Sequence, residues 1–170
     1  MVGWETHFFF VKMENVLKSK IEEFFRDKEY KIIDLIIRGE RGTKVIEIYA
    51  DNENGINIDE LARINRELNE TAENEIEFSG ISSLIVSSPG AERSFKYLWQ
   101  LKKHIGRTIE AELNSGEKTE GKLESIEEAG GGIIFLEIMK KEKGKKPVPE
   151  ITALNFSDIK ESRVKISFSK

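Results

Sequence analysis

Hydrophobic positions recur at helical spacing near the start of the chain. Between Glu14 and Lys28 the apolar residues fall on one face of a helix and charged residues occupy the other positions. This pattern predicts an amphipathic helix. The residues of its apolar face are Val16, Leu17, Ile21, Phe24 and Phe25.

Two short segments rich in isoleucine follow this helix. They run from Tyr30 to Arg38 and from Lys44 to Ala50, and Gly39 and Gly42 lie between them. Short β-prone runs separated by glycine predict two antiparallel strands joined by a turn.

A second helix is predicted by its start signal. Asn57 can cap the helix, Glu60 can complete a capping box, and Ile56 can pack onto Leu61. Acidic residues near this end suit the positive end of the helix dipole. The expected buried stripe consists of Leu61, Ile64, Leu68 and Ala72.

A third strand is predicted from Leu84 to Ser87, before the pair Pro89 and Gly90, which suits a tight turn. The order of elements up to this point is α-β-β-α-β. Because each helix has a single apolar stripe, we expect both helices to cover one face of a three-stranded sheet.

The second half of the chain has a different rhythm. A short helix from Phe95 to Lys103 is followed by five short segments with glycine-containing turns, which predicts a small all-β barrel. The fold class is therefore α+β. The five expected strands are Arg107–Leu113, Lys118–Ile126, Ile133–Met139, Glu150–Leu154 and Val164–Phe168.

Length and charge favour two domains. A chain of 170 residues can hold two small cores. Residues 1–92 contain 11 Lys and Arg against 19 Asp and Glu, whereas residues 93–170 contain 16 against 12. We expect an acidic domain at 13–92, a basic domain at 93–170 and an N-terminal extension at 1–12. The extension could also be an upstream start or an extra strand.

The composition argues against several classes of function. The chain has no cysteine and only two histidines, His7 and His104, so it is poorly supplied for a metal site or a histidine-based triad. Carboxylates are plentiful but spread over solvated helix faces. No segment is long and apolar enough to span a membrane, and the first twelve residues lack the pattern of a secretory signal. We expect a soluble, non-enzymatic protein without cofactor or metal.

The segment from Leu84 to Phe95 carries the most distinctive group of polar residues. It could form a binding surface or a fixed interdomain joint, or it could be a well-formed turn with incidental serines. A phosphate site there is weakly supported, because the P-loop pattern is absent. The candidate residues are Ser87, Ser88, Pro89, Gly90, Glu92 and Arg93.

A lysine-rich loop and a group of aromatic residues are further candidates. The loop at 140–149 could contact RNA phosphates or simply solubilise the rim of the barrel. Phe95, Tyr97 and Trp99 could stack on bases, as could Phe156 and Phe168, although we expect most of these five to be buried in the core. The lysines that could contact RNA are Lys140, Lys141, Lys143, Lys145 and Lys146.

The chain from Met13 to Phe168 resembles the RimP family of ribosome maturation factors. The resemblance is carried by KVIEIYADNENGINIDELARINREL at 44–68, LIVSSPGAER at 84–93 and HIGRTIEAEL at 104–113. The chain departs from the family at Ser94 and Phe95, where RimP sequences usually have proline and leucine. The loop at 140–149 and the segment before Met13 are also unusual for the family.

The resemblance implies an N-terminal α/β domain and a C-terminal barrel similar to Sm and SH3 folds. It further implies a cytoplasmic, monomeric factor that binds the free small ribosomal subunit late in assembly, without catalysis. Its expected partners are ribosomal RNA and a ribosomal protein near the decoding centre.

Two other functions are compatible with the residues themselves. One is a general RNA-binding module that acts through the barrel and the lysine loop. The other is an RNA-modifying or hydrolytic enzyme, which the shortage of histidine and cysteine disfavours.

Overall fold

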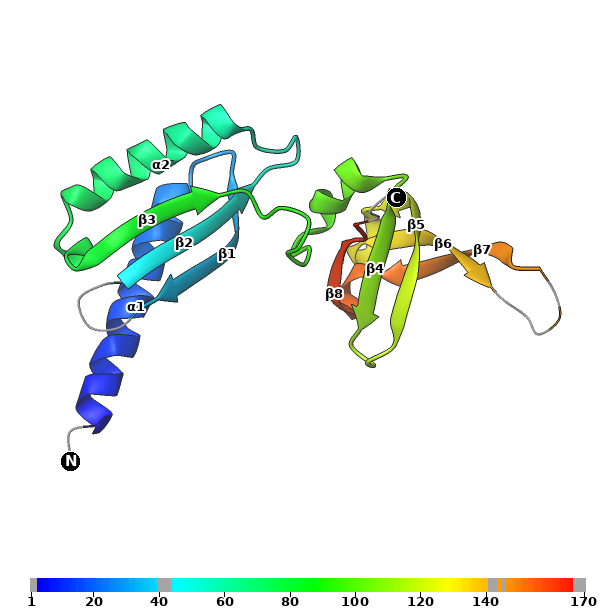
Figure 1. The fold of residues 1–170 in the computed structure, drawn as a ribbon, viewed down its shortest axis with the longest axis horizontal. Helices are drawn as coiled ribbons and strands as arrows, with labels where there is room; N and C mark the ends of the chain where they lie inside the picture. Colours follow the sequence, from blue (N-terminus) through cyan, green and yellow to red (C-terminus); the bar gives the residue numbers. More distant parts are fainter. Residues whose placement is uncertain (1–2, 40–43, 141–143, 145, 167–170) are drawn as a thin grey trace. The chain divides into compact units, whose positions relative to one another are not determined.

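The computed structural model describes residues 3–39, 44–140, 144 and 146–166, and the side chains from residue 11 onward. The chain divides into two compact units, Met1–Pro89 and Gly90–Lys170. The division falls within the Pro89–Gly90 turn. Each unit has its own sheet and its own hydrophobic core (Figure 1).

The N-terminal unit has the predicted α-β-β-α-β order. Its sheet has the strand order β1-β2-β3, with β1 and β2 antiparallel and β2 and β3 parallel. The parallel pair is possible because α2 returns the chain to the start of the sheet. The elements are α1 (Gly3–Phe25), β1 (Lys31–Arg38), β2 (Lys44–Asp51), α2 (Ile58–Glu73), the 3-10 helix η1 (Ile76–Phe78) and β3 (Ile81–Ser87).

Both helices of this unit bury their apolar stripes against one face of the sheet. Alternate residues of the central strand β2 are buried on that face. Residues from α1, α2 and the sheet form a single core cluster, which confirms the expected packing. The central side chains of this cluster are Leu17, Ile21, Ile46, Ile48, Ala50, Ile64 and Leu68.

The start of α2 is capped as the sequence predicts. The Asn57 side chain accepts a hydrogen bond from the Glu60 amide at 2.9 Å, and the Glu60 carboxylate accepts one from the Asn57 amide at 2.9 Å. Two otherwise unpaired amides are thus satisfied, which fixes where the helix begins.

Two asparagines of α2 cover the outer edge of β3. The Val86 amide donates to Asn65 Oδ1 at 3.0 Å, and Asn69 Nδ2 donates to the Leu84 carbonyl at 3.2 Å. An edge strand otherwise presents unpaired backbone groups to other chains. These two side chains therefore position α2 and also close part of the sheet edge.

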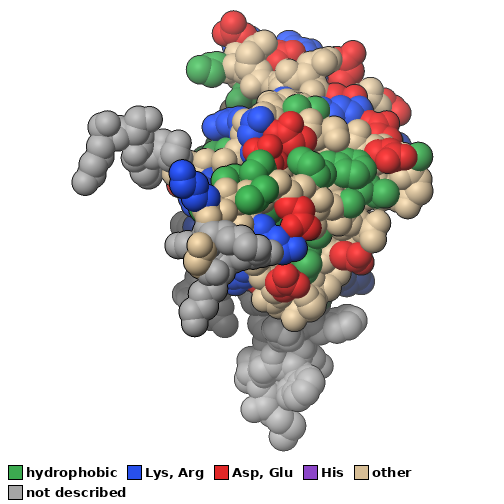
Figure 2. Space-filling model, turned by 90° about the vertical axis from the view of Figure 1, so that its right-hand side faces the viewer, with side chains coloured by type: hydrophobic (Ala, Val, Ile, Leu, Met, Phe, Trp, Pro, Cys, Tyr) green, Lys and Arg blue, Asp and Glu red, His purple; other side chains and the backbone are tan. Residues whose placement is uncertain are grey.

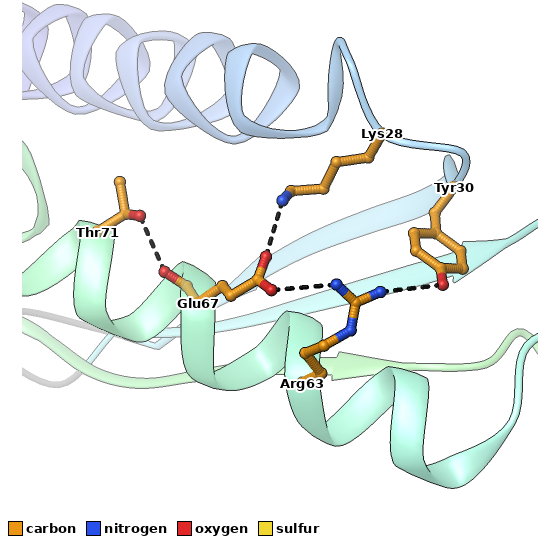
Figure 3. Close-up of polar contacts among 5 residues, drawn as sticks. All are labelled: Lys28, Tyr30, Arg63, Glu67 and Thr71. Atoms are coloured by element: carbon orange, nitrogen blue, oxygen red, sulfur yellow. Dashed lines mark hydrogen bonds and ion pairs between the residues drawn. The ribbon is translucent and has the colours of Figure 1, made fainter.

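A polar network joins α2 to the segment between α1 and β1 (Figure 3). Glu67 accepts from Lys28 at 2.8 Å and from Arg63 at 3.2 Å. Arg63 also reaches the hydroxyl of the buried Tyr30 at 3.4 Å, and that hydroxyl donates to Glu60 at 3.1 Å. The hydrogen bond from Lys28 is the main reason that the pKa of Glu67 lies below its ordinary value.

The C-terminal unit contains one antiparallel sheet with the order β7-β6-β5-β4-β8. The last strand of the chain therefore pairs with the first strand of the unit. The elements are the 3-10 helix η2 (Leu98–His104), β4 (Thr108–Leu113), β5 (Lys118–Glu127), η3 (Ala129–Gly131), β6 (Ile133–Lys140), β7 (Val148–Asn155), η4 (Phe156–Asp158) and β8 (Ile159–Val164).

Two expectations for this unit need correction. Among the described residues the sheet is open rather than a closed barrel, since β7 and β8 each pair with one neighbour only. The last described strand is Ile159–Val164, so the strand predicted to begin at Val164 instead ends there, and the remainder of that prediction at 167–168 lies outside the described residues. Polar residues hide the true strand, because a buried serine, Ser162, takes one inward position where an apolar residue would be expected.

The first residues that the structure describes are helical. α1 begins at Gly3, which extends the predicted helix backwards through the segment 3–13. The alternative that this segment forms an extra strand is therefore wrong.

Gly132 lets η2 lie close to the sheet. It adopts a positive φ of 92°, and a Cβ at this position would meet Leu98 Cδ2 of η2 at 2.7 Å. Leu98 packs against the core of the C-terminal unit together with the fully buried Leu101. The glycine thus provides both the turn and the space for the helix.

We predict that Glu67→Gln lowers the free energy of unfolding at neutral pH and has little effect near pH 3. The native pKa of Glu67 is lowered, so its stabilisation is present above the unfolded-state pKa and is lost as the pH falls through the native pKa. Urea unfolding at both pH values measures this difference. The exposed Glu70 on the same helix is the control, and an equal loss in Glu70→Gln would contradict the prediction.

We also predict that Gly132→Ala destabilises the C-terminal unit more than Gly131→Ala. Both glycines have positive φ, so both variants carry a backbone cost of about 1–2 kcal/mol. Only at Gly132 must Leu98 move, which adds roughly 1 kcal/mol or more of lost packing. Chemical denaturation measures both variants, and equal losses would show that the contact with Leu98 is unimportant.

Candidate functional site

The predicted polar segment lies where β3 ends. Ser87 is the last residue of β3 and pairs with Tyr49 of β2, while Ser88 is exposed. Pro89 is half-buried, and the exposed Gly90 has a φ of 64°, in the region that favours glycine. The exposed Glu92 and the half-buried Arg93 follow. The structure arranges these residues in succession along a turn at the boundary of the two units.

The departure from the family pattern at Ser94 and Phe95 has a structural role. The Ser94 hydroxyl accepts a hydrogen bond from the Ser162 amide at 2.9 Å, and the Phe95 amide donates to the Ser162 carbonyl at 2.9 Å. Ser162 lies in β8, so this segment pairs with the outer edge of the sheet. Phe95 packs against the core of the unit.

A buried amide organises the next residues. The Gln100 side chain is 2% exposed, and its Oε1 accepts hydrogen bonds from the amides of Lys96 and Tyr97 at 2.7 and 2.9 Å. Gln100 thus satisfies two backbone donors ahead of η2. The chain from Ser94 to Tyr97 is thus held in place by a hydrogen bond at each of its four residues.

Tyr97 and Trp99 do not behave as core residues. Their rings stack with a centroid distance of 5.6 Å and an interplanar angle of 10°. Both are half-buried, and neither belongs to the hydrophobic cluster found for the described residues of this unit. Core burial is thus confirmed for Phe95 but is wrong for this pair. The sequence YLW held a signal for this exposure. Tyr97 and Trp99 flank Leu98, and Leu98 packs against the core.

Only part of the lysine loop is described. Lys140 ends β6 and forms an ion pair with Glu150 of β7 at 2.8 Å, and Lys146 is exposed. Lys141, Lys143 and Lys145 lie outside the described residues. The loop therefore joins β6 and β7, as expected for a hairpin.

The outer face of the β6–β7 hairpin is apolar in part, which sequence reasoning missed. Met139 faces Pro149 and Glu137 faces Ile151, so these four side chains share the face opposite the buried Ile134 and Leu136. Met139 and Ile151 are more than half exposed. Figure 2 faces the C-terminal unit and shows hydrophobic side chains gathered among acidic ones.

The outer face of β4, β5 and β8 is a shallow depression lined by charged residues. Glu112 pairs there with Lys160 at 2.8 Å and Lys118 at 3.4 Å. The hydrogen bond from Lys160 is the main reason that the pKa of Glu112 is lowered. A general acid needs the opposite shift, so this arrangement suits an ion-pair network.

Within the described part of the chain, no group of three or more His, Cys, Asp or Glu side chains is placed to hold a metal ion. None of the helices in that part is long and apolar enough to cross a membrane.

We predict that Ser94→Ala destabilises the C-terminal unit by about 1–3 kcal/mol, because the buried Ser162 amide loses its acceptor. Ser94→Thr keeps a hydroxyl and should retain most of the stability. Thermal unfolding gives the stability, and hydrogen exchange should be faster at the Ser162 amide in the alanine variant. Identical exchange in both variants would argue against the hydrogen bond.

Comparisons with known proteins agree with this architecture. Residues 20–92, which span most of the N-terminal unit, match the family model of the RimP N-terminal domain. The chain is also 29% identical over 164 residues to a ribosome maturation factor RimP from Cytophaga hutchinsonii, covering 92% of this chain and 98% of that one. The resemblance predicted from the sequence is therefore confirmed, since residues 20–92 of this chain are similar to the RimP N-terminal domain.

Proposed function

We propose that this protein is a ribosome maturation factor that binds the free small ribosomal subunit and assists its late assembly without catalysis. The single observation that carries the proposal is the similarity to a ribosome maturation factor along almost the whole length of both chains. Similarity of this extent includes both units and the turn between them, so it concerns the whole arrangement rather than one shared domain.

The proposed mechanism is preferential binding. A factor that binds the mature arrangement of a subunit surface more tightly than the immature one shifts the population towards the mature form. The shift is limited by the difference between the two affinities, and no bond needs to be made or broken. This action requires complementary surfaces rather than an active site, and we place it in the cytoplasm, where the protein acts as a monomer.

We also propose that the open five-stranded sheet of the C-terminal unit is related to the Sm or SH3-like type of small barrel. The pairing of β8 with β4 supports this assignment, because it places the first strand of the unit beside the last described one. The short η4 also places β7 and β8 directly one after the other. Such small barrels commonly bind RNA or peptides through exposed sheet surfaces.

The β6–β7 hairpin is the surface that we propose for a ribosomal protein near the decoding centre. Its face combines the exposed Met139 and Ile151 with the carboxylate of Glu137. Contiguous exposed apolar side chains commonly mark protein interfaces. Acidic groups beside them suit a partner that is basic, as proteins embedded in RNA must be.

The turn at 87–93 has a different role in the proposal. Ser87, Ser88, Pro89, Gly90, Glu92 and Arg93 set the connection between the two units and contact the subunit. The position of the unit boundary at Pro89 and Gly90 supports the first of these roles.

Co-sedimentation with purified small subunits, large subunits and joined ribosomes tests the function. The protein should sediment with free small subunits and much less with the other two. Equal binding to all three, or to none, would refute the proposal. Strong binding to naked RNA that falls steeply with salt, without any subunit preference, would instead support a general RNA-binding module.

The hairpin surface gives a variant for the same experiment. Ile151→Asp places a charge among the apolar side chains, so binding to small subunits should fall at least about tenfold. Ile76→Asp is the control, because Ile76 is an isoleucine of the N-terminal unit that is 83% exposed and does not belong to the hairpin. If both variants bind like the unmodified protein, the hairpin is not the docking surface.

A further inference from the structure

The stacked pair of Tyr97 and Trp99 is the starting point of a further inference. The two rings are nearly parallel, and the 5.6 Å between their centroids corresponds to an offset stack. In an offset stack each ring covers only part of the other. Both residues also keep partial solvent access, although their neighbours Leu98 and Leu101 pack into the core.

The backbone beneath this pair is fixed before any ligand binds. The Gln100 side chain accepts hydrogen bonds from the amides of Lys96 and Tyr97. The preceding Ser94 and Phe95 are hydrogen-bonded to Ser162 in β8. On the other side, Leu98 rests on Gly132 and Leu101 is fully buried. A rigid aromatic surface loses little conformational entropy when a flat ligand stacks on it.

The charge around the pair is uniformly positive along the chain. Between residues 93 and 109 the sequence has five Lys and Arg and no Asp or Glu. The Lys96 ammonium lies 5.8 Å from the centroid of the Tyr97 ring. Trp99 and Lys102 are three residues apart in a 3-10 helix and therefore lie on the same side of it.

We propose that Tyr97 and Trp99 form a stacking platform for an unpaired RNA nucleotide, with Lys96 and Lys102 placed for the adjoining phosphates. A base of any type could stack on the aromatic rings, because every base has a flat π-face. This inference rests on the proposed function for the identity of the RNA, which would be a single-stranded part of the small subunit's ribosomal RNA.

RNA fits this surface better than a protein partner does. Lys102 forms an ion pair with Glu128, but the segment keeps an excess of positive charge when this carboxylate is counted. A basic ribosomal protein would be repelled by that excess, whereas phosphates would be attracted. Duplex RNA hides the faces of its bases, so only unpaired nucleotides can reach the platform.

Trp99 fluorescence provides a direct test in the full chain. The sequence has two tryptophans, so Trp4→Phe leaves Trp99 as the single reporter. Single-stranded oligouridine should quench this emission, and a duplex of the same length should not. Raising the salt concentration should weaken the quenching, because phosphate contacts release counterions. An unchanged emission with single-stranded RNA would overturn the proposal.

Variants test the roles of the platform and the cations. By fluorescence anisotropy, Trp99→Leu should bind labelled oligouridine roughly 5- to 150-fold more weakly, and Trp99→Phe should recover part of the loss. Lys96→Gln should weaken binding and reduce its salt dependence. The control is Lys118→Gln, since Lys118 is 79% exposed in the same unit and should make no difference. Full affinity in Trp99→Leu would overturn the platform.

Co-sedimentation of the same variants separates this inference from the proposed function. If the unmodified protein binds small subunits, Trp99→Leu binds them equally and no quenching occurs, the platform is refuted and the assembly function stands. If RNA quenches Trp99 but no subunit preference exists, the platform stands and the assembly function falls. Quenching by RNA-free ribosomal proteins but not by RNA would show a protein site and overturn the proposal.

Discussion

The hydrogen bonds between Ser94, Phe95 and Ser162 fix where the C-terminal unit begins. They attach the chain to the outer edge of β8 just after the turn that leaves the N-terminal unit. Backbone groups on a sheet edge must find partners, and here the connecting segment supplies them. Everything that follows in η2 depends on this attachment, because it sets the starting position of Gln100, Leu101 and the aromatic pair. Asn65 and Asn69 serve the edge of β3 in the same way.

The two units use different means to place polar groups at their surfaces. In the N-terminal unit one sheet face is covered by two helices, and the network around Glu67 joins α2 to the start of β1. In the C-terminal unit the strands alternate between core and solvent, so one face of each hairpin is available to a partner. Two of the proposed contact surfaces lie in the second unit: the hairpin face is apolar and acidic, and the stacked pair is aromatic and basic. The contacts proposed for Ser87, Ser88 and Pro89 lie at the end of the first unit.

The elements with strong local signals were predictable from the sequence. The capping residues Asn57 and Glu60 and the isoleucine-rich run of β2 made the elements of the N-terminal unit predictable, because local geometry and burial agree there. β8 was misplaced because the buried Ser162 is polar and its backbone pairs with the distant Ser94 and Phe95, which no hydrophobic pattern reveals. The role of Ser94 was also hidden, since its partner lies 68 residues away. The stacking of Tyr97 on Trp99 joins an extended residue just before η2 to one inside it, and no sequence pattern reveals such a contact.

The division of the chain at Pro89 and Gly90 has a consequence for how a bound protein leaves its partner. Two units joined by a short connection bind a large particle with avidity, because attachment of one raises the effective concentration of the other. Each contact can then be weak enough to break by itself. Dissociation proceeds in two small steps instead of one large one, so a competitor that captures either surface can prevent rebinding and displace the whole molecule.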